Sequence, residues 1–126
     1  GKVKLFKSHK PEFRDGGQLR DFIYVEDVAK VCYWLMNNSI ESGLYNLGTG
    51  RAKTFDDLVK ATFTGLGKEA VIEYIDMPED IREKYQYFTE ADMSKLRSAG
   101  YKDDFYSIEE GVKEYVTNYM AKKKYY

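Results

Sequence analysis

Histidine and cysteine, which often bind metals or act as nucleophiles, each occur once in this sequence, as His9 and Cys32. A single histidine excludes a site built on several histidines, and no Cys/His cluster has the spacing of zinc ligands. We expect His9 to be a solvated side chain of a polar loop, and Cys32 to lie on the apolar face of a helix. A Cys–His nucleophilic pair would require the fold to bring the two residues together.

Phosphate-binding glycine motifs are also absent from the sequence. Neither G-x-G-x-x-G nor G-x-x-x-x-G-K-[ST] occurs, so the usual turn that presents a helix N-terminus to a pyrophosphate is missing. The tripeptide at residues 48–50, Gly-Thr-Gly, favours a tight turn over a phosphate cradle. Arg51 and Lys53 beside it would suit an anion, although exposed cations next to a turn are common.

One Tyr-x-x-x-Lys spacing is present, at Tyr119 and Lys123. On a helix this spacing places both side chains on one face, where the ammonium can lower the pKa of the phenol. The pair lies at the lysine-rich C-terminal end, so we expect Tyr119 to complete an apolar stripe. The sequence therefore predicts no catalytic residue and no metal site.

Length and charge limit the classes of function. The 126 residues suit one domain, and 20 Lys plus Arg balance 21 Asp plus Glu, which disfavours a nucleic-acid partner. A single cysteine fits a reducing compartment, and we expect a cytoplasmic protein without a membrane segment or signal peptide. The chain starts at Gly1 and enters a strand pattern directly, so we expect a fragment, although a trimmed tag would look the same.

Strand and helix patterns alternate along the whole chain, which predicts the α/β class. Strands are predicted over residues 2–6, 21–25, 44–47 and 71–75, with a loop over residues 8–18. A helix is predicted to begin near Glu26 and to end at residues 37–39. Its apolar face is predicted to comprise Val28, Val31, Cys32, Leu35 and Met36.

Further helices are predicted from their start and stop signals. Capping boxes at Thr54 and Ser107 predict two helices, the first ending at Gly65 or Gly67. Residues 89–92 are predicted to cap a short helix that runs through Leu96 and stops at Gly100. These helices must position any binding residues that the chain contains.

Two motifs carry a resemblance to a known family. Residues 20–29, RDFIYVEDVA, followed after a helix by residues 45–50, YNLGTG, resemble the C-terminal half of extended short-chain dehydrogenase/reductases, the nucleotide-sugar epimerases and dehydratases. The order and separation of the two motifs make the resemblance specific. Further segments, at residues 48–52, 72–75, 85–92 and 96–101, resemble the members that epimerise an ADP-heptose at C6.

The resemblance implies a part of a larger isomerase. Residues 1–126 would form most of the small substrate-binding domain, together with late strands and helices of the Rossmann domain. The resemblance places the glycine-rich cofactor turn and the catalytic Tyr-x-x-x-Lys in an N-terminal half, which would bind NADP or NAD. It further implies epimerisation by transient oxidation, a role in lipopolysaccharide synthesis, homo-oligomers, and no turnover by this chain alone.

The resemblance also assigns substrate-binding residues. Arg20 matches a phosphate-contacting arginine and Tyr85 matches a substrate-contacting tyrosine, and a planar guanidinium and an aromatic face suit a nucleoside diphosphate. The stretch that contacts the substrate nucleotide is matched by Phe6, Lys7, Ser8 and His9.

Each assignment has a structural alternative. Arg20 would otherwise form a surface ion pair with Asp21 or Asp27, Tyr85 would be a packing residue, and Asp27 is most simply the cap of the helix beginning near Val28. The stretch over residues 10–19 is longer than in some relatives, which leaves the alignment of Phe6 to His9 uncertain and makes Arg14 a competing phosphate partner.

Two other functions fit the same pattern. One is a UDP- or dTDP-sugar epimerase or dehydratase of the same superfamily. The other is a non-catalytic nucleotide-sugar-binding module, which predicts a reading frame that begins close to Gly1. Competition between ADP and UDP or dTDP separates the first alternative from an ADP-sugar enzyme.

Overall fold

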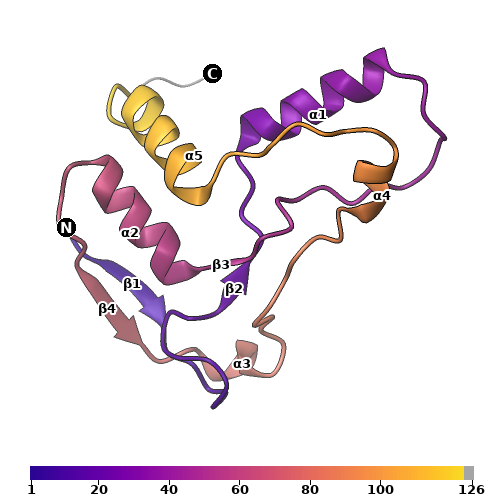
Figure 1. Cartoon of the computed structure of the whole chain (residues 1–126). Helices are drawn as coiled ribbons and strands as arrows, with labels where there is room; N and C mark the ends of the chain where they lie inside the picture. Colours follow the sequence, from indigo (N-terminus) through magenta and orange to yellow (C-terminus); the bar gives the residue numbers. More distant parts are fainter. Residues whose placement is uncertain (124–126) are drawn as a thin grey trace.

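The computed structural model describes residues 1–123 and has two small sheets joined by helices and long connections (Figure 1). Strands β1 (Val3–Phe6) and β4 (Ile72–Ile75) pair in parallel, with Val3 opposite Ile72 and Phe6 opposite Ile75. Strands β2 (Leu19–Arg20) and β3 (Lys53–Thr54) pair antiparallel, with Arg20 opposite Lys53. The α/β class predicted from the sequence is confirmed.

Two helices pack beside one another next to the parallel pair (Figure 1). Helix α2 (Phe55–Gly65) and helix α5 (Ile108–Tyr115) each begin with the predicted capping box, at Thr54 and Ser107. In both boxes the side-chain hydroxyl accepts a backbone N–H three residues ahead, and the carboxylate there accepts the N–H of the cap residue. A π-helical turn, η1 (Val116–Met120), continues α5.

A second group of elements surrounds α1 (Val25–Asn37) and α4 (Ser94–Ser98), on the far side of the molecule from β1 and β4 (Figure 1). Its core consists of Val31, Met93, Leu96, Tyr101 and Phe105. The rings of Trp34 and Tyr101 meet edge to face, 5.4 Å apart. The short helix α3 (Glu79–Arg82) lies in the connection after β4.

The strands predicted over residues 21–25 and 44–47 are wrong. Residue 24 has an extended backbone, but no strand in residues 1–123 pairs with either segment, and Val25 already belongs to α1. Alternating polarity predicts an extended chain, whereas a strand also requires a partner distant in sequence. The prediction of β1, β4 and the loop between residues 8 and 18 is confirmed.

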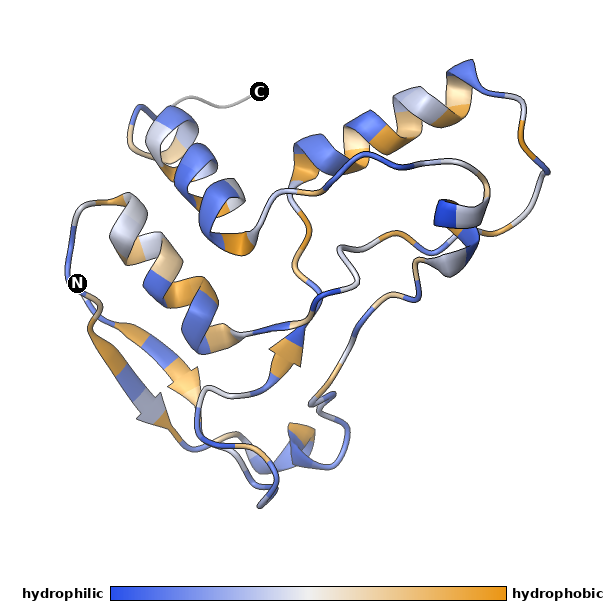
Figure 2. Cartoon of the chain, in the orientation of Figure 1, coloured by the Kyte–Doolittle hydropathy of each residue, from blue (hydrophilic) through white to orange (hydrophobic). Residues whose placement is uncertain are grey.

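Helix α1 is confirmed, but its predicted buried face is partly wrong. Val31 is 1% exposed, whereas Met36 is 83% exposed and Cys32 is also exposed. Figure 2 shows hydrophobic residues along the length of α1, so its apolar surface is wider than the part covered in this chain. Periodicity alone does not tell which part is covered.

Two further predictions about helix ends need correction. Asp27 is the third residue of α1 rather than its cap, and its buried carboxylate accepts the backbone N–H of Tyr106 at 2.9 Å. Helix α4 begins at Ser94, later than predicted. Of the residues predicted to cap it, Asp92 accepts the backbone N–H of Ser94 at 2.9 Å. Gly100, with φ of +113°, follows α4 as the sequence predicted.

Candidate functional site

Three of the predicted binding residues come together where the two sheets meet. Phe6 ends β1, Arg20 ends β2, and Tyr85 lies in the connection after α3. The ring centroids of Phe6 and Tyr85 are 6.1 Å apart and nearly perpendicular. The Arg20 guanidinium carbon lies 5.4 Å from the centre of the Tyr85 ring. The fold thus joins residues from three distant segments into one cluster.

A cavity of about 190 Å³ lies beside this cluster, and it is lined in part by Phe6, Phe55 and Tyr85. Lys4 and Gln18 contribute polar groups to its wall. Gln18 is buried and its side-chain amide donates to the carbonyl oxygens of residues 6 and 7, at 3.3 and 3.4 Å. Aromatic faces beside cationic side chains suit a planar base attached to phosphates.

The Arg20 guanidinium is held mainly by aromatic rings. It lies 5.8 Å from the Phe55 ring centre, in addition to its contact with Tyr85, and donates one hydrogen bond to the carbonyl oxygen of residue 19 at 2.8 Å. Within residues 1–123 no carboxylate forms a salt bridge with it. The alternative of an ion pair with Asp21 or Asp27 therefore does not describe this structure.

The other predicted residues, Lys7, Ser8 and His9, belong to the loop after β1 and do not line the cavity. The Lys7 ammonium pairs with Asp76 at 3.3 Å, and the Ser8 hydroxyl donates to the carbonyl oxygen of residue 10 at 2.8 Å. The His9 backbone N–H donates to the Tyr87 hydroxyl at 2.9 Å. The side chains of Lys7 and Ser8 are thus directed to protein partners, and the substrate contacts of all three residues stay a prediction.

Arg14, the competing phosphate partner, is already paired. Its guanidinium lies 3.1 Å from the buried carboxylate of Asp56, which also accepts the Tyr74 hydroxyl at 2.9 Å. Removing a cation from a buried carboxylate is costly. This arrangement favours Arg20 over Arg14 as the arginine open to a ligand.

The two motifs that carried the family resemblance meet at Asp21. Its carboxylate accepts the backbone N–H groups of Thr49, Gly50 and Ala91 at 2.7, 2.9 and 3.0 Å. Burial alone would raise the pKa of Asp21, but these bonds and one from the Thr49 hydroxyl outweigh it and hold the pKa below its usual value. A Cβ at Gly48 would lie 2.4 Å from this carboxylate, so a glycine is needed there.

This geometry shows how the Gly-Thr-Gly turn is used. The N–H groups of Thr49 and Gly50, which would face a phosphate in a cradle, point to Asp21. The turn therefore does not fit the pyrophosphate of a nicotinamide cofactor, and it joins two segments of the chain instead.

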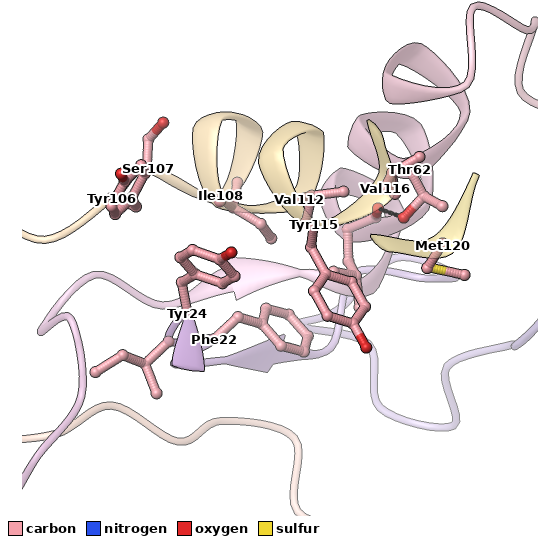
Figure 3. Close-up of a pocket in the computed structure, with 13 residues that line it drawn as sticks. Phe22, Tyr24, Thr62, Tyr106, Ser107, Ile108, Val112, Tyr115, Val116 and Met120 are labelled. Atoms are coloured by element: carbon pink, nitrogen blue, oxygen red, sulfur yellow. Dashed lines mark hydrogen bonds between the residues drawn. The ribbon is translucent and has the colours of Figure 1, made fainter. Parts of the chain in front are cut away.

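A second cavity, of about 250 Å³, lies between α2 and α5 and is mostly apolar. Figure 3 shows the rings of Phe22, Tyr24 and Tyr115 at its edge. The Tyr24 hydroxyl donates to Glu114, which lowers the pKa of Glu114, while burial and this carboxylate raise the pKa of Tyr24. We assign no ligand to this cavity.

The remaining candidates for chemistry are dispersed. Cys32 is an exposed residue of α1, and α1 lies far from the loop after β1 that carries His9 (Figure 1). Within residues 1–123 no group of His, Cys, Asp and Glu has the arrangement of a metal site, and no helix is long and apolar enough to cross a membrane. Lys123 is exposed and lies beyond the last helical turn.

Sequence reasoning missed three residues of the site, namely Gln18, Phe55 and Tyr87. Tyr87 had a signal, since two tyrosines separated by one residue in an extended segment point to the same side. Gln18 and Phe55 had none, because their roles depend on contacts between distant segments.

Comparisons with known proteins identify the relatives of this chain. The sequence profile described as the NAD dependent epimerase/dehydratase family matches residues 2–48. An ADP-L-glycero-D-manno-heptose-6-epimerase of Fusobacterium nucleatum is 52% identical, with 100% of this chain and 40% of that protein covered. One from Nitratidesulfovibrio vulgaris is 54% identical, with 96% and 38% covered. The chain thus spans about 40% of the length of the curated relatives that it matches.

Two solved structures of epimerases superpose on most of this chain. The ADP-L-glycero-D-manno-heptose-6-epimerase of Helicobacter pylori superposes with a TM-score of 0.71 at 29% identity, covering 92% of this chain and 32% of that one. The UDP-glucose 4-epimerase of Thermus thermophilus, in complex with NAD, gives a TM-score of 0.69 at 25% identity, covering 89% and 33%. In sequence and in fold, the chain is thus similar to part of the NAD-dependent epimerases and dehydratases.

Proposed function

We propose that residues 1–126 are the substrate-binding, C-terminal part of an ADP-L-glycero-D-manno-heptose 6-epimerase, which recognises the ADP group of the substrate through Arg20 and Tyr85. The observation that carries the proposal is the Arg20 guanidinium held against the Tyr85 ring, beside a cavity with aromatic walls, with no carboxylate bound to it in residues 1–123. Identity of 52% to a relative of that name supports the choice of substrate.

The whole protein would be an isomerase that oxidises and reduces C6 of the heptose with NADP or NAD. The name of the matching family supports a nicotinamide cofactor. The Gly-Thr-Gly turn is occupied by Asp21, so this cofactor would be held mainly by the rest of the protein. Lipopolysaccharide synthesis in the cytoplasm and a homo-oligomeric whole protein belong to the same proposal.

The surface of α1 supports the idea that this chain is part of a longer protein. Tyr33 and Met36 of α1 are 70% and 83% exposed, and Leu44 in the following segment is 92% exposed. Within residues 1–123, no backbone–backbone hydrogen bond involves residues 44–47. An apolar surface beside a segment without backbone pairing is typical of an interface. We propose that the remaining polypeptide covers it.

Titration of the chain with ADP, followed by calorimetry, tests the binding role. Arg20→Gln should weaken ADP binding by about 10- to 100-fold, because charge-assisted bonds to phosphate are lost. Arg51→Gln is the matched control, since Arg51 is exposed and its side chain donates one long hydrogen bond, of 3.5 Å, to the carbonyl oxygen of residue 105. Equal effects of the two variants would contradict the proposal.

Competition separates the rival functions. An ADP-sugar enzyme predicts that ADP displaces a bound fluorescent ADP analogue better than UDP or dTDP does. Preference for UDP or dTDP would assign a different substrate to the same fold. Adding NADP and ADP-heptose to the chain alone should give no epimerisation, and turnover would contradict the assignment of catalysis to the rest of the protein.

A further inference from the structure

Tyr87 connects the loop after β1 to the candidate nucleotide site. It is 5% exposed, and its hydroxyl accepts the backbone N–H of His9 at 2.9 Å. Its carbonyl oxygen accepts the N–H of Leu19 at 2.8 Å, which ties it to β2, the strand that ends in Arg20. One residue therefore touches the predicted nucleotide-contacting stretch and lies next to the strand that carries the arginine.

The ring of Tyr87 extends these connections. It meets the Tyr85 ring edge to face at 5.6 Å and the Phe13 ring at 5.1 Å. The Lys10 ammonium lies 4.7 Å from its centre. Arg20, Tyr85, Tyr87 and Lys10 consequently form a continuous series, with a cation at each end of two packed tyrosines.

Other contacts hold the loop by its base. The Gly16 N–H donates to the carbonyl oxygen of Phe6 at 3.2 Å, and Arg14 pairs with Asp56. The Ser8 N–H donates to Asp15 at 2.8 Å within the loop itself. None of these contacts reaches Tyr85. Phe6 meets the Tyr85 ring directly at the end of β1, and Tyr87 adds the contact that couples the far end of the stretch, at His9, to the same ring.

We propose that Tyr87 is a positioning residue for nucleotide binding: its hydroxyl fixes the Phe6 to His9 stretch, and its ring fixes the face of Tyr85. The inference rests on the proposed function. Holding a loop and a ring in the bound arrangement lowers the ordering cost of binding. Removing the hydroxyl alone should therefore weaken binding less than removing the ring as well.

Two variants separate these contributions. Tyr87→Phe keeps the ring and leaves the His9 N–H without its acceptor, and we expect about a fivefold rise in the ADP dissociation constant, as for one lost hydrogen bond. Tyr87→Leu also removes the ring contacts, and we expect a rise of about 20-fold or more. Tyr45→Phe is the control, because it removes another tyrosine hydrogen bond, to the carbonyl oxygen of residue 41, at a distant place.

Calorimetry with ADP and amide hydrogen exchange by NMR provide the readouts. We expect faster amide exchange at His9 in Tyr87→Phe, and a loss of ADP affinity that is larger in Tyr87→Leu than in Tyr87→Phe. In Tyr45→Phe, neither the exchange at His9 nor the ADP affinity should change. A lower melting temperature with unchanged affinity in both Tyr87 variants would show a merely structural role and overturn the inference. Failure of the proposed function would instead appear in the unchanged chain, which would not bind ADP.

Discussion

Helices α2 and α1 use their apolar residues in opposite ways. Helix α2 buries Val59, Ala61 and Phe63 against its surroundings, with α5 packed beside it. Helix α1 buries Val31 but leaves Cys32 and Met36 exposed. The first region carries the Arg20 and Tyr85 site, and the second carries an uncovered apolar surface. Under the proposed function, binding and docking are therefore assigned to separate regions.

The carboxylate of Asp21 and the turn at residues 48–50, which it holds, join the two regions. Breaking this junction should therefore have the largest effect on stability. Gly48→Ala places a Cβ 2.4 Å from the Asp21 carboxylate and 2.7 Å from Ala91. We expect it to lower the free energy of unfolding by about 2–3 kcal/mol, measured by urea denaturation. Gly67→Ala is the control, because its Cβ would meet no atom within 4 Å and only the φ of +65° opposes it, costing about 1 kcal/mol. Equal losses of unfolding free energy in the two variants would contradict the role of Asp21 as a junction.

Acid should weaken the same junction. The pKa of Asp21 is lowered in the folded chain, so its bonds stabilise the fold above the ordinary carboxyl pKa, near 3.9, and are lost as the pH falls below it. Asp57 behaves in the same way. Burial alone would raise its pKa, but hydrogen bonds from Thr54 outweigh burial and hold the pKa below its usual value. We expect the urea midpoint to fall from pH 5 to pH 3, and to fall less steeply in Asp21→Asn. A parallel decline in the variant would contradict this.

The bond between Tyr24 and Glu114 links the segment before α1 to α5. Tyr24→Phe should cost about 1 kcal/mol of unfolding free energy, as for one hydrogen bond. It should also let the pKa of Glu114 rise toward its usual value, because the Tyr24 hydroxyl is the main cause of the lowering. Carboxyl shifts followed by NMR during an acid titration measure this change, and an unaltered pKa would rule out the link.

The smallest effect is expected on the uncovered surface. Met36→Ser should change the stability of this chain by less than about 0.5 kcal/mol, because the side chain is 83% exposed. The full-length protein should lose more stability from the same substitution. Cys32, the single cysteine of this chain, reports on the same surface. Its thiol should react quickly with a maleimide here and slowly in the full-length protein, and equal rates would contradict docking at α1.

Local signals predicted the parts of the fold that depend on nearby residues. The capping boxes at Thr54 and Ser107 and the apolar spacing of α2 and α5 are local, and they gave the correct helices. Pairing of the segments at residues 21–25 and 44–47 depends on partners far along the chain, and these strands were predicted wrongly. The burial of Asp27 against the Tyr106 N–H had no local signal either.

The candidate site divides in the same way. Phe6, Arg20 and Tyr85 came from motif resemblance, and the structure brings them together. Phe55 and Gln18, which line the same cavity, carry no motif and become visible only when α2 and the loop after β1 are packed. The resemblance therefore named residues that the fold brings together, their binding role stays a prediction, and the shape of the cavity required the fold.

The most direct test of the central claim is a map of amide shifts in the chain as ADP is added, recorded by NMR. The account predicts that the changes gather at Phe6, Arg20 and Tyr85, and that the amides of α1 and of the turn at residues 48–50 stay in place. Shifts concentrated at Thr49 and Gly50 would mean that the glycine turn binds the phosphates, and they would contradict the assignment of the site to Arg20 and Tyr85.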